Sequence, residues 1–221
     1  MAAVAGAAFF DAIAHKYDRE YALPASESRA RMKAVLRALP PNARVLDLGV
    51  GTGRELGALQ DAGHTPTGLD FSAPMLAVCR RRARPVPLVQ ANLWGPLPFA
   101  DGAFDAVVAL HGTLAHPEDL GALTRLPIEL ARVLTPQGVL VLEVPAPEWL
   151  ATLDGAPGGE LRARRTAQDR CVHEDRAAGV AIEAIFLDDE AWRALLAPAF
   201  AGALLIEPIG LFERRIVARR C

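Results

Sequence analysis

The chain has few aromatic residues, few cysteines and no surplus of charge of either sign. Only 6% of its 221 residues are aromatic, which predicts an aliphatic core. Lys and Arg total 24 against 26 for Asp and Glu, a formal net charge of −2. Proteins that bind nucleic acids normally carry a basic surplus. The charge balance therefore disfavours nucleic acid as a partner and favours a small-molecule substrate.

Long apolar segments and paired cysteines are also absent. No apolar run approaches the ~20 residues that a membrane-spanning helix needs. Residues 1–14 are small and apolar but lack the basic start of a secretory signal. Cys79, Cys171 and Cys221 lie far apart without C-x-x-C spacing, which predicts unpaired thiols. The sequence thus predicts a cytoplasmic protein with no membrane span.

Short apolar runs alternate with helical patterns along most of the chain. Buried strands are predicted at 44–48, 65–70, 86–91, 104–110 and 138–144. Helices are predicted at 28–39, 54–62, 72–84 and 118–134. This alternation is typical of an α/β fold with a parallel sheet and helices on both faces. A strand at 180–187, a helix at 189–196 and an apolar segment at 204–217 complete the expected fold.

Two regions depart from this alternation. Residues 1–40 are expected to form a helical N-terminal cap that ends before Pro40 and Pro41. Residues 145–175 are rich in proline, glycine and arginine, which predicts a loop or a small insert over one end of the sheet. We find no internal repeat and no second hydrophobic core, so residues 1–221 are expected to form a single domain.

The most informative motif joins the first strand to the next helix and reads Asp47-Leu48-Gly49-Val50-Gly51-Thr52-Gly53-Arg54. Glycines at such a junction permit a sharp turn and bring backbone N–H groups close to a ligand. A dinucleotide-binding loop would need its third glycine where Arg54 stands, and the Gly-Lys-Ser/Thr of a phosphate-binding loop is absent. A glycine-rich turn without a ligand is the alternative.

Asp70 is the second part of the signal. It follows Gly68-Leu69 at the carboxyl end of the second predicted strand. A carboxylate at this place can accept hydrogen bonds from the two hydroxyls of a ribose. The alternative is a residue that only caps the following helix. The glycine motif and Asp70 together indicate a nucleoside-containing ligand more strongly than either does alone.

With these residues, three further segments resemble class I S-adenosylmethionine (SAM)-dependent methyltransferases, in particular the ubiquinone and menaquinone biosynthesis group: Phe10–Asp18, Leu97–Asp105 and Arg132–Gly138. The resemblance implies a Rossmann-like seven-stranded sheet of order 3-2-1-4-5-7-6 with strand seven antiparallel. It also implies SAM as cofactor, S-adenosyl-L-homocysteine as product and a small molecule as methyl acceptor. Two alternatives stay open: a SAM-binding sensor or assembly protein without methyl transfer, and an NAD-dependent oxidoreductase, which Arg54 disfavours.

The resemblance also implies which residues bind the cofactor. Asp47 would hold the methionine end, the backbone of Gly49, Gly51 and Gly53 would pack against it, and Asp70 would bind the ribose. Asn92 stands where the family has an acid that accepts a hydrogen bond from adenine, and an amide oxygen can still accept one. The other expected contacts are Phe71, Met75, Leu93, Leu110 and Tyr17. Core packing is the alternative for Phe71, Met75 and Tyr17.

The methyl-transfer site is implied at residues 110–117, at the end of the fourth strand. His111 and His116 are candidate bases there, because imidazole titrates near neutral pH and a hydroxyl acceptor must lose a proton. The alternative is that one of them shapes the pocket and the other caps a helix.

Residues around the 145–175 segment could contact the substrate. Trp149 and His173 flank it, and Arg162, Arg164 and Arg165 could attract an acidic molecule, although core packing and solvation are the simpler explanations. No metal site is predicted, because the five histidines show no ligand spacing with acids or cysteines.

Overall fold

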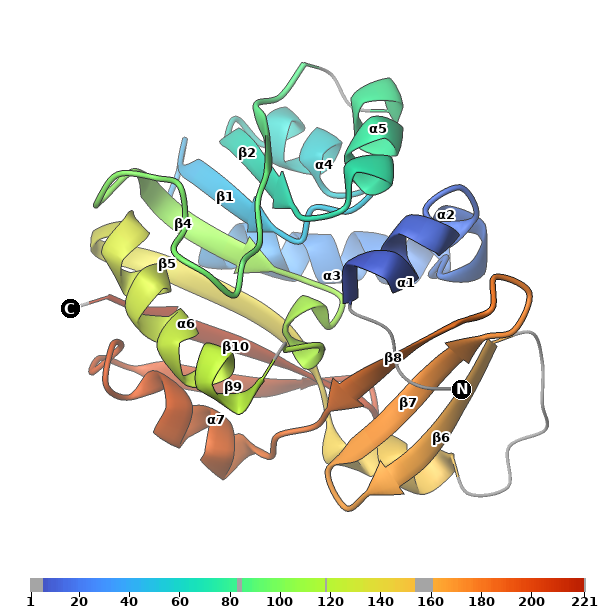
Figure 1. Cartoon of the computed structure of the whole chain (residues 1–221). Coiled ribbons are helices and arrows are strands. Elements are labelled where there is room, and N and C mark those ends of the chain that lie inside the picture. Colours follow the sequence, from blue (N-terminus) through green and yellow to red (C-terminus); the bar gives the residue numbers. More distant parts are fainter. Residues whose placement is uncertain (1–5, 83–84, 118, 154–160, 221) are drawn as a thin grey trace.

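The computed structural model describes residues 6–82, 85–117, 119–153 and 161–220. Seven strands form its main sheet: β1 (Arg44–Leu48), β2 (Thr65–Asp70), β3 (Leu88–Gln90), β4 (Phe104–Ala109), β5 (Leu134–Pro145), β9 (Leu204–Ile209) and β10 (Glu213–Arg219). Their order is β3-β2-β1-β4-β5-β10-β9, and β10 is antiparallel to both of its neighbours (Figure 1). The predicted order 3-2-1-4-5-7-6 is confirmed, with β9 and β10 as strands six and seven.

Helices cover both faces of this sheet: α3 (Ala25–Ala38), α4 (Leu56–Asp61), α5 (Ala73–Arg82), α6 (Leu120–Val133) and α7 (Asp189–Leu196). Successive strand residues point to opposite faces. In β1, Val45 packs with residues of α3 and α4, whereas Leu46 and Leu48 pack in the cluster that includes α6 and α7. Figure 1 shows α6 and α7 in front of the sheet and α3 behind it. Burial on both faces explains the continuous apolar runs of the central strands.

The C-terminal part of the sheet is a hairpin. The sequence predicts one apolar segment at 204–217, but the structure divides it into β9 and β10 at Gly210. Gly210 has a φ of 60°, a conformation that glycine adopts without the strain imposed by a Cβ atom. The turn lets β10 run antiparallel between β5 and β9.

A second, smaller sheet follows β5. A 3-10 helix at Pro147–Thr152 precedes β6 (Leu161–Ala167), β7 (Arg170–Asp175) and β8 (Val180–Ile185), which pair antiparallel in that order. The described part of the 145–175 segment, predicted as a loop or a small insert, therefore contains regular structure. The strand predicted at 180–187 belongs to this small sheet and not to the main one.

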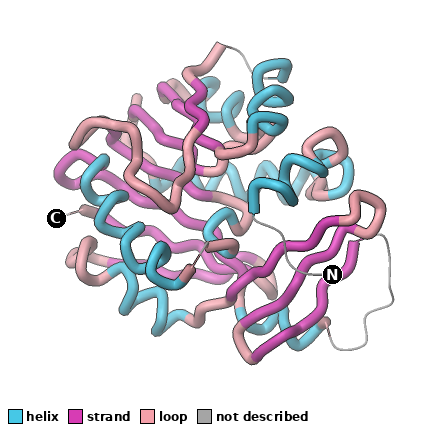
Figure 2. Tube along the Cα trace, in the orientation of Figure 1, coloured by secondary structure: helices cyan, strands magenta, loops and turns pink. Residues whose placement is uncertain are grey.

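The N-terminal residues form α1 (Gly6–Ile13) and α2 (Tyr17–Glu20), which lie between α5 and the small sheet (Figures 1 and 2). The Lys16 ammonium lies 2.6 Å from the Asp175 carboxylate of β7, and both side chains are buried.

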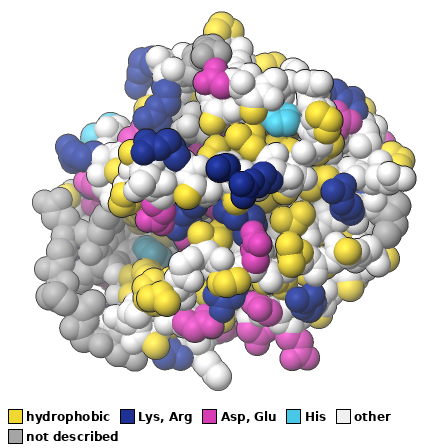
Figure 3. All heavy atoms as spheres, turned by 180° about the vertical axis from the view of Figure 1, so that it is seen from behind, with side chains coloured by type: hydrophobic (Ala, Val, Ile, Leu, Met, Phe, Trp, Pro, Cys, Tyr) yellow, Lys and Arg dark blue, Asp and Glu magenta, His cyan; other side chains and the backbone are white. Residues whose placement is uncertain are grey.

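Among the helices that the structure describes, none is long and apolar enough to cross a membrane. The face seen in Figure 3 carries basic, acidic and hydrophobic side chains intermixed.

Candidate active site

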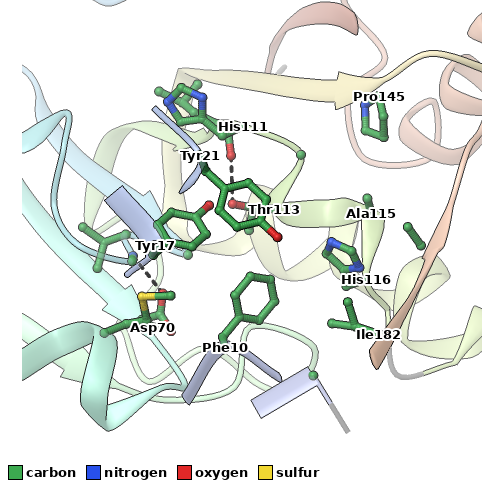
Figure 4. A pocket seen from close by; sticks show the side chains of 18 of the residues that line it. Phe10, Tyr17, Tyr21, Asp70, His111, Thr113, Ala115, His116, Pro145 and Ile182 are labelled. Atoms are coloured by element: carbon green, nitrogen blue, oxygen red, sulfur yellow. Dashed lines mark hydrogen bonds between the residues drawn. The ribbon is translucent and has the colours of Figure 1, made fainter. Parts of the chain in front are cut away.

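A cavity of about 410 Å³ lies at the carboxyl ends of β1, β2 and β4. Its lining comes from the glycine loop, the segment after β4, the N-terminal helices and the small sheet. In Figure 4, Asp70 and Tyr17 lie on one side of this space and His116 and Ile182 on the other, with Phe10 between them. Ligands of open α/β sheets bind at this edge, beyond the carboxyl ends of the strands.

The glycine loop approaches this cavity with its backbone. Gly49 and Gly51 have φ values of 67° and 52°, which favour glycine. The N–H groups of Gly49 and Val50 donate to the carbonyl of Leu69 at 2.8 and 3.0 Å. A Cβ atom on Gly49 would lie 2.4 Å from Cγ2 of Thr113. The loop therefore needs glycine both for its conformation and for the space beside Thr113.

Gly53 has a different part in this loop. Its φ is 76°, and an added Cβ atom would lie 2.5 Å from Sγ of the buried Cys79. Gly53 does not line the cavity. The third glycine therefore permits the close packing of the loop on α5 and makes no cavity surface.

Asp70 holds the glycine loop through backbone hydrogen bonds. Its Oδ2 accepts from the N–H of Gly51 at 2.8 Å, and its Oδ1 accepts from the N–H of Ser72 at 2.8 Å. Burial raises the pKa of the Asp70 carboxyl, and the two backbone hydrogen bonds act in the opposite direction. Each carboxylate oxygen has a second lone pair, so Asp70 can still accept hydrogen bonds from a ligand.

Asp47 is a cavity-lining residue with a buried carboxylate oxygen that lacks a hydrogen-bond partner in the described part of the chain. The residue is 3% exposed, and its Oδ2 has no hydrogen-bond partner among the described residues. Burial, followed by the negative charges of Glu55 and Asp70, raises the pKa of its carboxyl well above the ordinary value. A buried carboxylate with an open oxygen is suited to a cationic ligand, which would compensate both the burial and the repulsion.

His111 has an acidic partner that the sequence did not reveal. Its Nε2 lies 2.7 Å from Oε1 of Glu55, the residue just before α4. His111 itself has a φ of 54°, uncommon for a residue with a Cβ atom. Both side chains line the cavity. Glu55 lies two residues beyond Gly53, at the start of α4, which faces the same edge of the sheet. In the sequence, only this position next to the glycine motif could have indicated that Glu55 belongs to the site.

Aromatic and imidazole rings line the other end of the cavity. Trp149 is stacked on His173, with centroids 5.4 Å apart, and on Phe186 at 5.5 Å. His116 meets His173 edge to face at 6.0 Å and Phe10 at 5.7 Å. Trp149 and His173, predicted to flank the 145–175 segment and as possible substrate contacts, are thus brought beside the segment after β4.

The N-terminal helices are fixed over the glycine loop by polar contacts. Asp18 accepts a hydrogen bond from Thr52 Oγ1 at 2.6 Å, and Asp11 accepts one from Ser72 Oγ at 2.6 Å. The guanidinium of Arg54 lies 4.9 Å from the centre of the Tyr17 ring. Tyr17 therefore lies over the loop and lines the cavity, as its expected place above a cofactor requires.

Asn92 departs from its expected place. Its side chain is exposed and does not line the cavity, and its Oδ1 accepts a hydrogen bond from the N–H of Trp94 at 3.0 Å. The neighbours Leu93 and Trp94 line the cavity instead. Apart from Gly53 and Asn92, every predicted cofactor-binding or catalytic residue lines it, including Met75 and Leu110.

Two of the three arginines that the sequence suggested for an acidic substrate, Arg164 and Arg165, do not line the cavity. Arg164 is exposed, and Arg165 donates to the carbonyls of Ala167 and Gln168. The side chain of Arg162 and all of Cys221 lie outside the described residues. Cys79 and Cys171 are free and buried. Within the described ranges no group of three or more His, Cys, Asp or Glu residues could hold a metal ion.

Comparison with known proteins confirms the resemblance that the motifs indicated. Residues 46–142 match the family model described as a methyltransferase domain. A demethylmenaquinone methyltransferase from Renibacterium salmoninarum is 37% identical over 139 residues, which cover 62% of this chain and 56% of the relative. The chain therefore spans little more than half of that relative. The NAD-dependent oxidoreductase alternative finds no support in these matches.

Solved structures share the fold over nearly the whole chain. A protein from Pyrococcus horikoshii OT3 has a TM-score of 0.76 at 20% identity and covers 94% of this chain and 97% of its own. The sugar N-methyltransferase KedS8 from Streptoalloteichus sp. has a TM-score of 0.71 at 25% identity, with 92% and 91% covered. The Rossmann-like methyltransferase fold expected for the chain is confirmed.

Proposed function

We propose that this chain, whose residues 46–142 match the methyltransferase domain family, is an enzyme that transfers the methyl group of SAM to a small molecule. The observation that carries this proposal is the unpaired carboxylate of Asp47 beside the loop ordered by Asp70. Two of the similar proteins named above are described as methyltransferases of demethylmenaquinone and of a sugar. Because these acceptors differ, the acceptor of this chain is proposed only as a small molecule.

The residues at the glycine-loop end of the cavity fit SAM. Oδ2 of Asp47 would accept a hydrogen bond from the ammonium of the methionine part, which satisfies the one open oxygen. Asp70, with its remaining lone pairs, would bind the ribose hydroxyls. The surfaces of Phe71, Met75 and Leu93 would contact the adenine.

Two expected cofactor contacts change in this proposal. The hydrogen bond to adenine assigned to Asn92 loses support, since that side chain lies outside the cavity. Leu93 and Trp94 replace it as the residues that border the adenine. Gly53 would act indirectly, through the packing of the loop on Cys79.

Methyl transfer needs alignment more than it needs a reactive side chain. Bound SAM supplies an electrophilic methyl group on a positively charged sulfur. The protein holds both reactants in line and keeps water away, and such positioning can account for much of the rate. His111, hydrogen-bonded to Glu55, lines the cavity and would orient groups bound there.

We also propose that residues 1–221 act as one methyltransferase domain. The main sheet, the N-terminal helices and the small sheet all contribute to one cavity. None of the three parts would form the site alone.

The proposal is tested by calorimetric titration with S-adenosylhomocysteine, with NAD as the control ligand. We expect micromolar binding of S-adenosylhomocysteine and none of NAD. Asp70→Ala should abolish the binding, because it removes the acceptor that orders Gly51 and the groups for the ribose. Asp105→Asn is the matched control, since Asp105 pairs with Arg44 outside the cavity. No binding to the native chain would refute the proposal.

Methyl transfer itself is tested with labelled SAM and a panel of acceptors. Binding of S-adenosylhomocysteine together with transfer to one acceptor supports the enzyme. Binding without transfer to any member of a broad panel would instead favour a SAM-binding protein that acts as a sensor or assembly partner.

A further inference from the structure

The hydrogen bond of His116 determines which of its ring nitrogens carries a proton. Nδ1 lies 2.8 Å from the backbone carbonyl oxygen of Glu183. A carbonyl oxygen can only accept, so Nδ1 is the donor. In a neutral ring Nε2 then carries the lone pair, and no described residue is its hydrogen-bond partner. His116 thus brings one hydrogen-bond acceptor to the lining of the cavity.

Burial keeps this ring and its neighbour neutral. Burial lowers the pKa of the His116 imidazole, and it lowers that of His173 to about 3. The two rings lie with centroids 6.0 Å apart, so two positive charges there would also repel each other. Neither ring is therefore a cation that could attract an anionic acceptor.

The surroundings of His116 favour a flat and uncharged molecule. The parallel rings of His173, Trp149 and Phe186 form a stack beside it, and the rings of His173 and Trp149 are inclined by only 8°. Aromatic rings prefer offset-stacked or edge-to-face neighbours, and Phe10 already meets His116 edge to face. Carboxylates outnumber guanidinium groups in the cavity lining, which disfavours an anion further.

We propose that His116 is the residue that binds and orients the methyl acceptor, which is an uncharged ring compound whose nucleophilic hydroxyl or amine donates a hydrogen bond to Nε2. The ring stack of His173, Trp149 and Phe186 contacts the rest of that molecule. This inference rests on the proposed methyl transfer and deepens it by naming the chemical class of the acceptor.

The step that this arrangement allows is balanced in atoms and electrons. A lone pair of the acceptor oxygen or nitrogen forms the new bond to the methyl carbon. The carbon–sulfur bond of SAM breaks, and its electron pair stays on sulfur as S-adenosylhomocysteine forms. The proton of the acceptor passes along its hydrogen bond to Nε2 of His116 and then to water. Because the methylated oxygen or nitrogen is cationic before this loss, even a weakly basic imidazole can take the proton.

The test uses the complex of the full chain with S-adenosylhomocysteine and two matched probes. One is 2-naphthol, and the other is 2-methylnaphthalene, in which a methyl group replaces the hydroxyl. We expect the native complex to bind 2-naphthol about tenfold more tightly than 2-methylnaphthalene, because only 2-naphthol can donate a hydrogen bond to the buried acceptor. The anion 2-naphthoate should bind more weakly than 2-naphthol.

Three variants assign the difference to one atom. His116→Phe keeps a ring but has no acceptor, so both probes should bind equally. His116→Gln places an amide oxygen near the position of Nε2 and should restore a preference for 2-naphthol. His15→Phe is the control, because His15 is exposed and lies outside the cavity lining.

Each other outcome overturns the proposal. A native complex that does not distinguish the two probes, or that binds neither, contradicts the assignment of an acceptor site. A preference that persists in His116→Phe shows that another group binds the hydroxyl. Failure of the proposed function is recognised separately: the native chain would then bind no S-adenosylhomocysteine, or would bind it and transfer no methyl group to any acceptor of the panel.

Discussion

The two ends of the cavity are built in different ways. The end proposed for the cofactor consists of the β1 and β2 ends and the loop that carries Gly49 and Gly51. Its shape depends on backbone N–H groups of residues 49–51 and 72, which donate to the carbonyl of Leu69 and to the carboxylate of Asp70. The acceptor end consists of side chains from α1, the segment after β4 and the small sheet. A local backbone motif can be preserved while distant side chains change. Because the two ends differ in this way, one kind of cofactor site can be combined with different acceptor sites on the same fold.

The largest effect is expected from removing the charge of Asp47 at the cofactor end. Asp47→Asn should weaken S-adenosylhomocysteine binding by roughly 10- to 100-fold, because a charge-assisted hydrogen bond to the ammonium is lost. Calorimetry measures the change. Binding of 2-naphthol to a complex saturated with S-adenosylhomocysteine should not change. A loss of affinity for both ligands would show that the two ends are not separate.

The same variant should be more stable than the native protein when no ligand is bound. Burial raises the pKa of the Asp47 carboxyl in the folded state, so the ionised form is disfavoured there. The Asp47 carboxyl therefore does not lower the free energy of unfolding below its unfolded-state pKa of about 3.9, where it is protonated in both states. As the pH rises through its folded-state pKa, the protein loses stability because the unfolded state releases this proton more readily. Asp47→Asn should raise the melting temperature at neutral pH, by about 2–4 °C for each kcal/mol added to the free energy of unfolding. This gain should vanish near pH 4. A lower melting temperature at pH 7 would contradict this account.

The grouping of residues at the end proposed for the cofactor could be predicted from sequence because its signals are local. Gly49 and Gly51 need positive φ values, and Asp70 follows them at the end of the next strand. Strand order and the antiparallel seventh strand came from the family resemblance that these residues support. Asn92 illustrates the limit, because a family position predicts a residue's place in the chain but not the hydrogen bond that its side chain makes.

The acceptor end could not be predicted in the same way. The β6 and β7 strands lie in a segment rich in arginine, so the alternation of buried and exposed residues was not visible. The pairing of His111 with Glu55 joins residues 56 positions apart, and the stack of Trp149 on His173 depends on how the small sheet folds back. Such contacts follow from tertiary packing, for which a single sequence carries no local signal.

An intermediate effect is expected at the pair of cavity-lining side chains formed by His111 and Glu55. Glu55→Gln and His111→Asn should each weaken S-adenosylhomocysteine binding by about fivefold, and the double variant by no more than either, because both remove one interaction. Asn is chosen because it tolerates the positive φ of residue 111. Losses that multiply in the double variant would show that the two residues act independently.

A smaller effect is expected at the contact that joins the N-terminal helices to the small sheet. Asp175→Asn removes the ion pair with Lys16, whereas Glu20→Gln removes a longer one of 3.3 Å within the same helical segment. Hydrogen exchange of α1 and α2 should be faster in Asp175→Asn than in Glu20→Gln, while the glycine loop should be unaffected in both. Faster exchange throughout the glycine loop would mean that the two ends open as one unit.

The smallest effect concerns the two buried thiols: Cys79, which packs on the glycine loop, and Cys171, which packs with residues of the acceptor end. Burial raises the pKa of the Cys79 thiol to about 11 and that of the Cys171 thiol to about 12, so both should react slowly with a disulfide reagent. Cys79 packs against the glycine loop, whereas Cys171 packs beneath Phe186 and Leu150. S-adenosylhomocysteine should therefore slow the reaction of Cys79 further and leave that of Cys171 unchanged. Mass spectrometry of a Cys221→Ser background measures the two rates, and equal protection of both thiols would show that ligand binding at one end stabilises the other.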